Sequence, residues 1–445
     1  MIAGHALDRS ALPLLFTLAL GVFAGALDLG VLSPALPALG VTFAVPTHEL
    51  AWIFTLYLIA NVVGIAVMST LADRYGRRPV YIACVTIFAL GSVLAIFSPN
   101  FWLFLLARAV QAIGAGGIFP VATAAIGDTV AVEKRGAALG MVAAMWGLAA
   151  IIGPLVGGLV THFVSWRWIF VANIPFAITV IVLAARYVPV NAPRTRGPLD
   201  AIGLVLLTTG LLALMCGFTQ NILISTLLGT AAIVAFAFYE RHVAFPMIPA
   251  SLFAKRNVLI TYALEFVIGI LEGALFFIPT VLVAAQHLSF AAAGAIAAIG
   301  AFVFVAVIPV SGRALDRVGA RSVLLAGTIF TAAGLAVFAT GFDSLTLSIA
   351  AMVVAGLGFG ALLGAPTRYI ITNETPAANR ATAVGLLSQF LIFGQIVGAS
   401  LAGGIVKFAG SELPGFHAAY ITFACLALVA LGVTTLLRNP STSSG

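Results

Sequence analysis

Asn257–Val283 reads N-V-L-I-T-Y-A-L-E-F-V-I-G-I-L-E-G-A-L-F-F-I-P-T-V-L-V, and its only charged residues are Glu265 and Glu272. A helix of about 20 apolar residues crosses the hydrocarbon core of a bilayer, so this run predicts a membrane-spanning helix. Two helical turns separate the glutamates, which places them on one face, about 10.5 Å apart along the axis. A charge at the bilayer centre costs about 2.5–3.5 kcal/mol even on lenient scales, so carboxylates at this depth indicate a function.

Similar apolar runs recur along the whole chain. Of the 445 residues, 62% are hydrophobic and only 8% are charged, whereas soluble domains carry roughly 25% charged residues. We therefore predict an all-α polytopic membrane protein with 14 transmembrane helices. The predicted spans cover residues 12–39, 50–72, 79–98, 101–126, 136–160, 167–188, 200–220, 222–239, 257–283, 291–311, 321–340, 346–367, 381–406 and 416–437.

The basic residues predict the orientation of these spans. With a cytoplasmic N-terminus, eighteen of the 21 Lys and Arg residues fall on the cytoplasmic side, only Arg167 and Lys407 fall outside, and Arg108 lies within a span. Because cytoplasmic loops carry an excess of Lys and Arg, we expect both termini to be cytoplasmic in a cell (inner or cytoplasmic) membrane. The alternative, a signal peptide cleaved near Ala24-Gly25-Ala26, would leave an odd number of spans. The net charge of +7 arises in these short loops, so no nucleic-acid partner is expected.

Two internal matches predict a repeated architecture. Residues 126–158 resemble residues 371–403 at a constant offset of 245, and residues 73–76 match residues 316–319 at an offset of 243. Two parallel halves related by an axis along the membrane normal would produce such matches. We therefore predict pseudosymmetric six-helix bundles at 1–190 and 257–445, with two additional helices in 191–256, which gives a 6+2+6 order.

Five polar residues within the spans are candidates for a proton-coupling or substrate site: Asp28, Arg108, Gln111, Glu265 and Glu272. A lone arginine in a membrane needs a partner, and the acidic residues are the candidates. Burial favours the protonated form of a carboxylate, whereas a neighbouring arginine favours the ionised form. A motion that changes either influence would load and release a proton. The alternative is that one of these acids only pairs structurally with a neighbouring helix.

The loop after the second predicted span reads Ser69-Thr70-Leu71-Ala72-Asp73-Arg74-Tyr75-Gly76-Arg77-Arg78. It resembles the signature loop G-x-L-A-D-R-x-G-R-R of the major facilitator superfamily, with Ser69 in place of the first glycine. The resemblance implies a cytoplasmic charge latch that favours one access state, formed by Asp73, Arg74, Arg77 and Arg78 around Gly76. The alternative is a basic loop that only fixes the topology.

Four further stretches resemble motifs of the same superfamily. The antiporter motif G-x(5)-G-P-x-x-G-G of the superfamily resembles Gly147 followed by Gly153-Pro154-Leu155-Val156-Gly157-Gly158. The resemblance implies a bendable and tightly packed helix. The alternative is that the pattern reflects small-residue packing alone. Arg108-Ala109-Val110-Gln111 resembles its buried R-x-x-Q element. Leu27-Asp28 with Ala35-Leu36-Pro37, and Trp166-Arg167-Trp168-Ile169-Phe170 with Asn173 and Pro175, resemble patterns of the fourteen-span drug:proton antiporter family.

The resemblance covers essentially the whole chain and implies a proton-coupled secondary transporter. We expect it to export lipophilic, cationic drugs by antiport through alternating access, as a monomer in the lipid bilayer, with no cofactor, metal or enzymatic activity. Two alternatives stay open: a lipid or metabolite exporter of the same fold, and a transporter-like sensor without flux. Asp28→Asn or Glu272→Gln is expected to leave the protein folded and to abolish proton-driven efflux.

Overall fold

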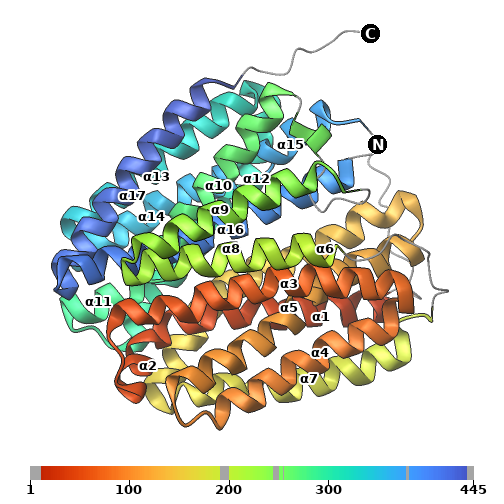
Figure 1. Ribbon diagram of the computed structural model, residues 1–445, viewed down its shortest axis with the longest axis horizontal. Coiled ribbons are helices and arrows are strands. Elements are labelled where there is room, and N and C mark those ends of the chain that lie inside the picture. Colours follow the sequence, from red (N-terminus) through yellow and green to blue (C-terminus); the bar gives the residue numbers. More distant parts are fainter. Residues whose placement is uncertain (1–11, 191–199, 244–249, 254, 377–379, 438–445) are drawn as a thin grey trace. The chain divides into compact units, whose positions relative to one another are not determined.

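The computed structural model describes residues 12–190, 200–243, 250–253, 255–376 and 380–437 (Figure 1). Its described residues form helices and no strands. Fourteen segments are long and apolar enough to cross a membrane, which confirms the predicted number of spans. Both termini lie outside the described residues, as do Arg9, Arg194, Arg196 and Arg438, four of the basic residues predicted to be cytoplasmic.

Several spans are broken rather than continuous, which the apolar runs alone did not predict. The first consists of α1 (Leu12–Leu32), a 3-10 turn and α2 (Leu36–Phe43). The ninth consists of α10 (Arg256–Leu275) and α11 (Ile278–Gln286), and the twelfth of α14 (Leu345–Leu362) and α15 (Pro366–Glu374). A proline occupies one of the first two positions of α2, α11 and α15. Proline lacks the N–H that an uninterrupted helix needs, so each new helix begins there.

The chain divides into two compact units, of which the first comprises residues 1–44 and 56–204. Besides α1 and α2, it contains most of α3 (Ala51–Tyr75), all of α4 (Arg77–Ile96), α5 (Phe101–Thr129) and α6 (Val132–Phe163), and α7 (Arg167–Tyr187). In this unit α1 packs against α6, and α4 packs against both α5 and α7 (Figure 1). Its core is a cluster of buried apolar side chains from these helices, which includes Tyr81, Cys84 and Phe88 of α4.

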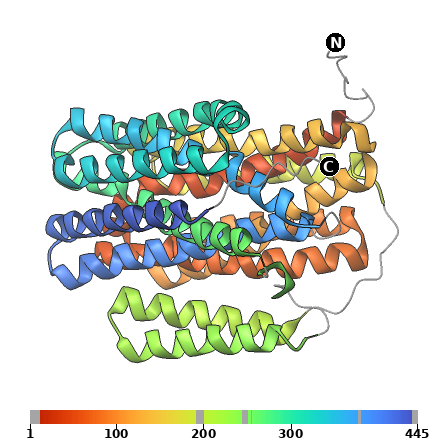
Figure 2. The same cartoon turned by 90° about the horizontal axis from the view of Figure 1, so that it is seen from above.

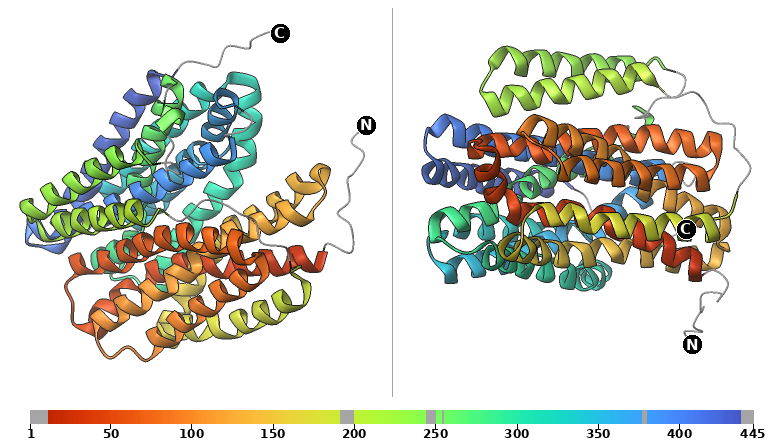
Figure 3. Two further views of the ribbon diagram at one scale, coloured as in Figure 1. Left: turned by 45° about the vertical axis from the view of Figure 1, so that its right-hand side comes forward. Right: turned by 90° about the horizontal axis from the view of Figure 1, so that it is seen from below.

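The second unit comprises residues 45–55 and 205–445. It contains α8 (Ala201–Gln220) from residue 205 onward, α9 (Leu223–Glu240), α12 (Phe290–Val318), α13 (Ala320–Gly341), α16 (Arg380–Ala409) and α17 (Glu412–Thr435), together with α10, α11, α14 and α15. The tightest helix pairs are α10 with α16 and α13 with α14. The predicted additional helices α8 and α9 lie side by side as a hairpin (Figures 2 and 3), whose turn contains Asn221 at φ 57°.

Matched positions of the two predicted repeats share the same backbone geometry. Gly76 precedes α4 at φ 96° and ψ 159°, and Gly319 precedes α13 at φ 80° and ψ 162°. Only glycine adopts this region readily, so both sites need a residue without Cβ. Arg135 Nε donates to the Val130 carbonyl at 2.9 Å, and Arg380 Nε donates to the Thr375 carbonyl at 3.3 Å. These equivalent contacts support the internal repeat that the offsets predict.

The two basic residues predicted to lie outside both hold the end of a helix. Arg167 Nε donates to the carbonyl of Ile96, the last residue of α4, at 3.2 Å. Lys407 Nζ donates to the carbonyl of Gln220, the last residue of α8, at 3.0 Å. A cation at a helix C-terminus satisfies a free carbonyl and interacts favourably with the helix dipole. These contacts give Arg167 and Lys407 structural roles that are independent of membrane orientation.

Candidate functional site

The first unit contains a fully buried polar cluster around Asp28 of α1. Gln111 Nε2, from α5, donates to Asp28 Oδ1 at 2.7 Å, and Asn173 Nδ2, from α7, donates to the same oxygen at 3.0 Å. Arg108 Nη1, also from α5, binds Asp28 Oδ2 at 2.5 Å. Ser92 of α4 accepts from Gln111 and Asn173 at 2.8 and 3.3 Å. The cluster therefore joins side chains from four helices, and its central carboxylate binds those of α5 and α7 directly.

Arg108 is held by charge, amide and aromatic contacts at once. Besides the ion pair, its Nη1 donates to Gln111 Oε1. Its guanidinium carbon lies 4.1 Å from the ring centre of Tyr57 and 5.8 Å from that of Phe170. Among the described residues, Arg108 Nε and Nη2 have no hydrogen-bond partner. Attraction between a desolvated cation and ring faces partly offsets the two missing hydrogen bonds.

The structure thus brings Asp28, Arg108 and Gln111 together as one cluster in the first unit. Two of the partners, Ser92 and Asn173, were not among the predicted site residues. Asn173 belongs to the stretch that resembles the drug:proton antiporters, but its sequence position gave no indication that it contacts Asp28. Single neutral polar residues are common in apolar helices, so the sequence carried no signal for Ser92.

Glu265 and Glu272 lie on α10 in the second unit, in surroundings unlike those of Asp28. Glu265 is 5% exposed, and its Oε2 has no hydrogen-bond partner among the described residues. Thr367 and Arg368 of α15 interact with its carboxyl group, as does Glu272 of the same helix. Glu272 is half-buried and accepts from Gln395 Nε2 of α16 at 2.9 Å. In the described part of the chain, neither glutamate forms an ion pair with Lys or Arg.

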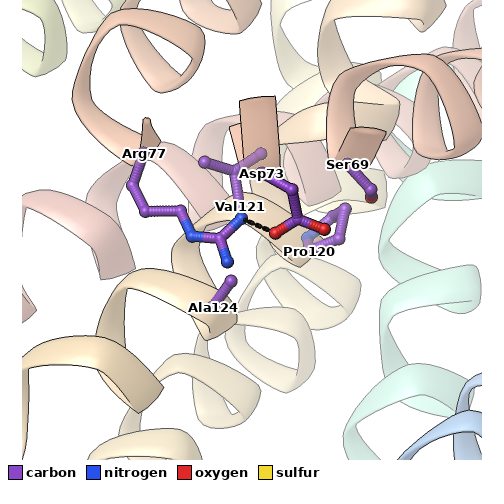
Figure 4. Close-up of a pocket in the computed structure, with 6 residues that line it drawn as sticks. All are labelled: Ser69, Asp73, Arg77, Pro120, Val121 and Ala124. Atoms are coloured by element: carbon purple, nitrogen blue, oxygen red, sulfur yellow. Dashed lines mark ion pairs between the residues drawn. The ribbon is translucent and has the colours of Figure 1, made fainter. Parts of the chain in front are cut away.

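The loop predicted as a latch forms a charged cluster with one residue the sequence did not single out. Arg77 Nη1 lies 2.6 Å from Asp73 Oδ1, and Arg77 Nε lies 3.0 Å from Asp128 Oδ2 of α5. Asp73 and Arg77, joined by this ion pair, line a cavity of about 170 Å³ (Figure 4). The cavity is lined by Ser69, Asp73, Arg77, Pro120, Val121 and Ala124. Arg74 is exposed and Arg78 is half-buried.

The glycines of α6 allow its backbone to touch that of α1. A Cβ placed on Gly153 would lie 3.0 Å from Gly30 Cα, and one on Gly157 would collide with the carbonyl of Val31. Pro154 lies against Gly30 in the same contact, and Gly158 is buried. These are the close approaches that small residues permit in membrane helices. The contacts account for the glycine spacing by packing, and the gating role of the motif stays a prediction.

The fourteen candidate membrane helices, the broken spans and the buried polar clusters within each helical unit define a polytopic helical membrane protein. A family model described as the Major Facilitator Superfamily matches residues 18–263 and 258–445. The chain belongs to this superfamily, which confirms the resemblance that its motifs gave.

Relatives and solved structures agree with this family. The chain is 33% identical over 420 residues to an uncharacterized MFS-type transporter YfiU of Bacillus subtilis (strain 168), covering 88% of this chain and 79% of the relative. It is 29% identical to a multidrug resistance protein B homolog of Mycobacterium tuberculosis (strain ATCC 25618 / H37Rv), covering 79% and 69%. An acurin A biosynthesis cluster MFS-type transporter of Aspergillus aculeatus is 31% identical, covering 58% and 50%. The crystal structure of a D-xylose-proton symporter superposes with a TM-score of 0.74 at 15% identity, covering 98% and 99%.

Proposed function

We propose that this chain exports lipophilic, cationic compounds in exchange for protons. In this proposal the carboxylates of Glu265 and Glu272 bind the proton and the cationic compound in turn. The observation that carries this proposal is the contrast between the two units. Asp28 accepts hydrogen bonds from Gln111 and Asn173 and forms an ion pair with Arg108, whereas the two glutamates of α10 form no ion pair within the described residues.

This contrast divides the five predicted site residues into two groups. Protonation of Asp28 would leave the Arg108 guanidinium buried without its counterion, and breaking a buried pair in this way costs about 3–5 kcal/mol. The polar cluster of Asp28, Arg108 and Gln111 therefore serves as a fixed structural contact that holds α1, α5 and α7 together. Protonation of Glu265 or Glu272 breaks no ion pair, so these carboxylates can change charge during transport.

Exchange follows from competition at the same carboxylates. An ionised carboxylate inside a membrane span needs a compensating positive charge, which a proton or the cationic group of a substrate supplies. Binding of one therefore favours release of the other, and a one-for-one swap of a proton for a monovalent cation is electroneutral. The printed name of the mycobacterial relative, a multidrug resistance protein homolog, supports a drug as substrate.

The cluster of Asp73, Arg77 and Asp128 and the α1–α6 contact are proposed as the moving parts. Arg74, Gly76 and Arg78 adjoin this cluster in sequence, and Gly153, Pro154, Gly157 and Gly158 form or adjoin the α1–α6 contact. We place the protein in the cytoplasmic membrane as a monomer with a 6+2+6 arrangement and both termini in the cytoplasm, in line with the distribution of its basic residues.

A metabolite exporter of the same fold is the second candidate, because the relative from Aspergillus is named after a biosynthesis cluster. Both candidates are tested in proteoliposomes containing the full chain. An imposed pH gradient is expected to drive efflux of a lipophilic cationic dye, and lipids and small acids are run in parallel to identify the cargo. Glu265→Gln and Glu272→Gln should abolish the pH-driven component, whereas the exposed control Asp343→Asn should retain it.

Absence of any pH-driven flux in the wild type would contradict the proposed function and leave the sensor alternative. Flux of lipids or small acids without flux of cationic dyes would favour the second candidate. Wild-type efflux by both glutamine variants would remove the glutamates from the mechanism.

A further inference from the structure

Gln395 of α16 is the described side chain that hydrogen-bonds to the Glu272 carboxylate. Its Nε2 lies 2.9 Å from Glu272 Oε2, and Gln395 itself is 7% exposed. A buried amide needs its hydrogen-bonding capacity satisfied, so its orientation is constrained by this contact. The sequence reasoning did not single out this residue, which lies in an apolar run far from α10 along the chain.

The backbones of α10 and α16 fix the position of this contact. A Cβ placed on Gly269 would lie 2.9 Å from Gly394 Cα, and one on Gly273 would lie 2.6 Å from the carbonyl oxygen of Gln395. A Cβ on Gly398 would collide with the carbonyl of Ile270. The helices therefore touch on both sides of Glu272 and cannot slide without separating. Their register holds the Gln395 amide against the carboxylate.

An amide can bind both charge states of a carboxyl group. Its NH₂ donates to an ionised carboxylate, and its carbonyl oxygen accepts from the O–H of a protonated one after the amide turns over. Arginine offers donors only, so Arg108 cannot accept a hydrogen bond from the O–H of a protonated Asp28. A neutral partner with both functions therefore suits a group that gains and loses a proton.

We infer that Gln395 is a positioning residue for proton exchange: it holds the Glu272 carboxyl group in place in both charge states and stabilises the ionised state by donating a hydrogen bond. This inference rests on the proposed function, because it assigns a partner to one of the two exchanging carboxylates. Glu265, whose Oε2 has no hydrogen-bond partner among the described residues, lacks an equivalent amide donor in the described part of the chain.

The test measures the protonated carboxyl group of Glu272 directly. Infrared difference spectra of the full-length protein in liposomes are recorded over a pH titration. The C=O band of the protonated acid that disappears in Glu272→Gln belongs to Glu272. In Gln395→Met, a variant of similar shape without the amide, the midpoint of this band should move to higher pH by about one unit, because the ionised form has lost a donor.

Ser400→Ala is the matched control, because Ser400 is a buried polar residue of the same helix whose hydroxyl, among the described residues, donates to the backbone carbonyl of Ile396 alone. It should leave the midpoint unchanged. Thermal unfolding of each variant shows whether the fold is intact, and Gln395→Asn, which keeps an amide on a shorter side chain, provides a second variant. Its midpoint should lie between those of the wild type and Gln395→Met.

An unchanged midpoint in Gln395→Met would overturn the inference, as would the absence of any band that depends on Glu272. Dye efflux is measured on the same samples. A shifted band in a protein without pH-driven efflux would uphold the role of Gln395 and refute the proposed function. Normal pH-driven efflux with an unshifted band would refute the role of Gln395 and uphold the proposed function. If the pH profile of efflux moves together with the band, both stand.

Discussion

Neutralising Asp28 should destabilise the first unit, because Arg108 then loses its only counterion in the described structure. Asp28→Asn keeps the size of the side chain and one acceptor oxygen, but it leaves the guanidinium charged at a site where both residues are 0% exposed. Removal of one partner of a buried ion pair costs about 3–5 kcal/mol. With the scaling of soluble units of 150–250 residues, this corresponds to a fall in Tm of roughly 6–20 °C.

From the sequence alone, Asp28→Asn is expected to leave the protein folded and to abolish proton-driven efflux. The buried ion pair changes this expectation to a loss of stability. The assay is thermal unfolding of purified protein in detergent, followed by tryptophan fluorescence at a fixed heating rate. The double variant Asp28→Asn/Arg108→Gln removes both charges and should regain most of the lost stability, since replacing both partners avoids the unpaired charge. A Tm of Asp28→Asn equal to that of the wild type, or a double variant less stable than either single one, would refute the reasoning.

Three further substitutions test the packing that surrounds these sites. Gly76→Ala forces a Cβ into a backbone region suited to glycine and should lower the free energy of unfolding by about 1–3 kcal/mol. The control Gly432→Ala, where an added Cβ meets nothing within 4 Å, should not lower it. Chemical unfolding compares the two variants. Gly157→Ala pushes α6 away from the Val31 carbonyl and should impair efflux more than Gly140→Ala, where an added Cβ meets nothing within 4 Å. Equal efflux by both variants would argue against a role of the α1–α6 contact in transport. Lys407→Met should release α8 from α16 and speed hydrogen exchange of the amides at the end of α8, while Lys407→Arg should retain most of the protection.

The membrane spans could be predicted because hydrophobic length is a direct physical requirement of the bilayer. The turn between α8 and α9 coincides with the predicted division between residues 220 and 222. The breaks within spans were harder to predict from the apolar runs. Pro37, Pro279 and Pro366 begin new helices, whereas Pro120, Pro154, Pro175 and Pro309 lie inside continuous ones, so proline alone does not locate a break.

The charged members of the candidate site and Gln111 could be predicted, but not their other neutral partners. Asp28, Arg108, Glu265 and Glu272 stand out because charge is rare inside an apolar run. Ser92, Asn173 and Gln395 are neutral, and their importance depends on which helices meet, which is a tertiary property. The sequence also gave no reason to separate Asp28 from the glutamates, because the distinction arises from the donors that surround each carboxylate.

Substrate-induced proton release tests most directly whether the carboxylates of α10 exchange protons for substrate. A lipophilic cationic dye is added to purified wild-type protein in weakly buffered detergent solution, and the released protons are counted with a pH indicator. The wild type and Asp343→Asn should release protons on binding, and Glu265→Gln/Glu272→Gln should release none. Undiminished release by the double glutamine variant would contradict the account, because another group would then carry the proton.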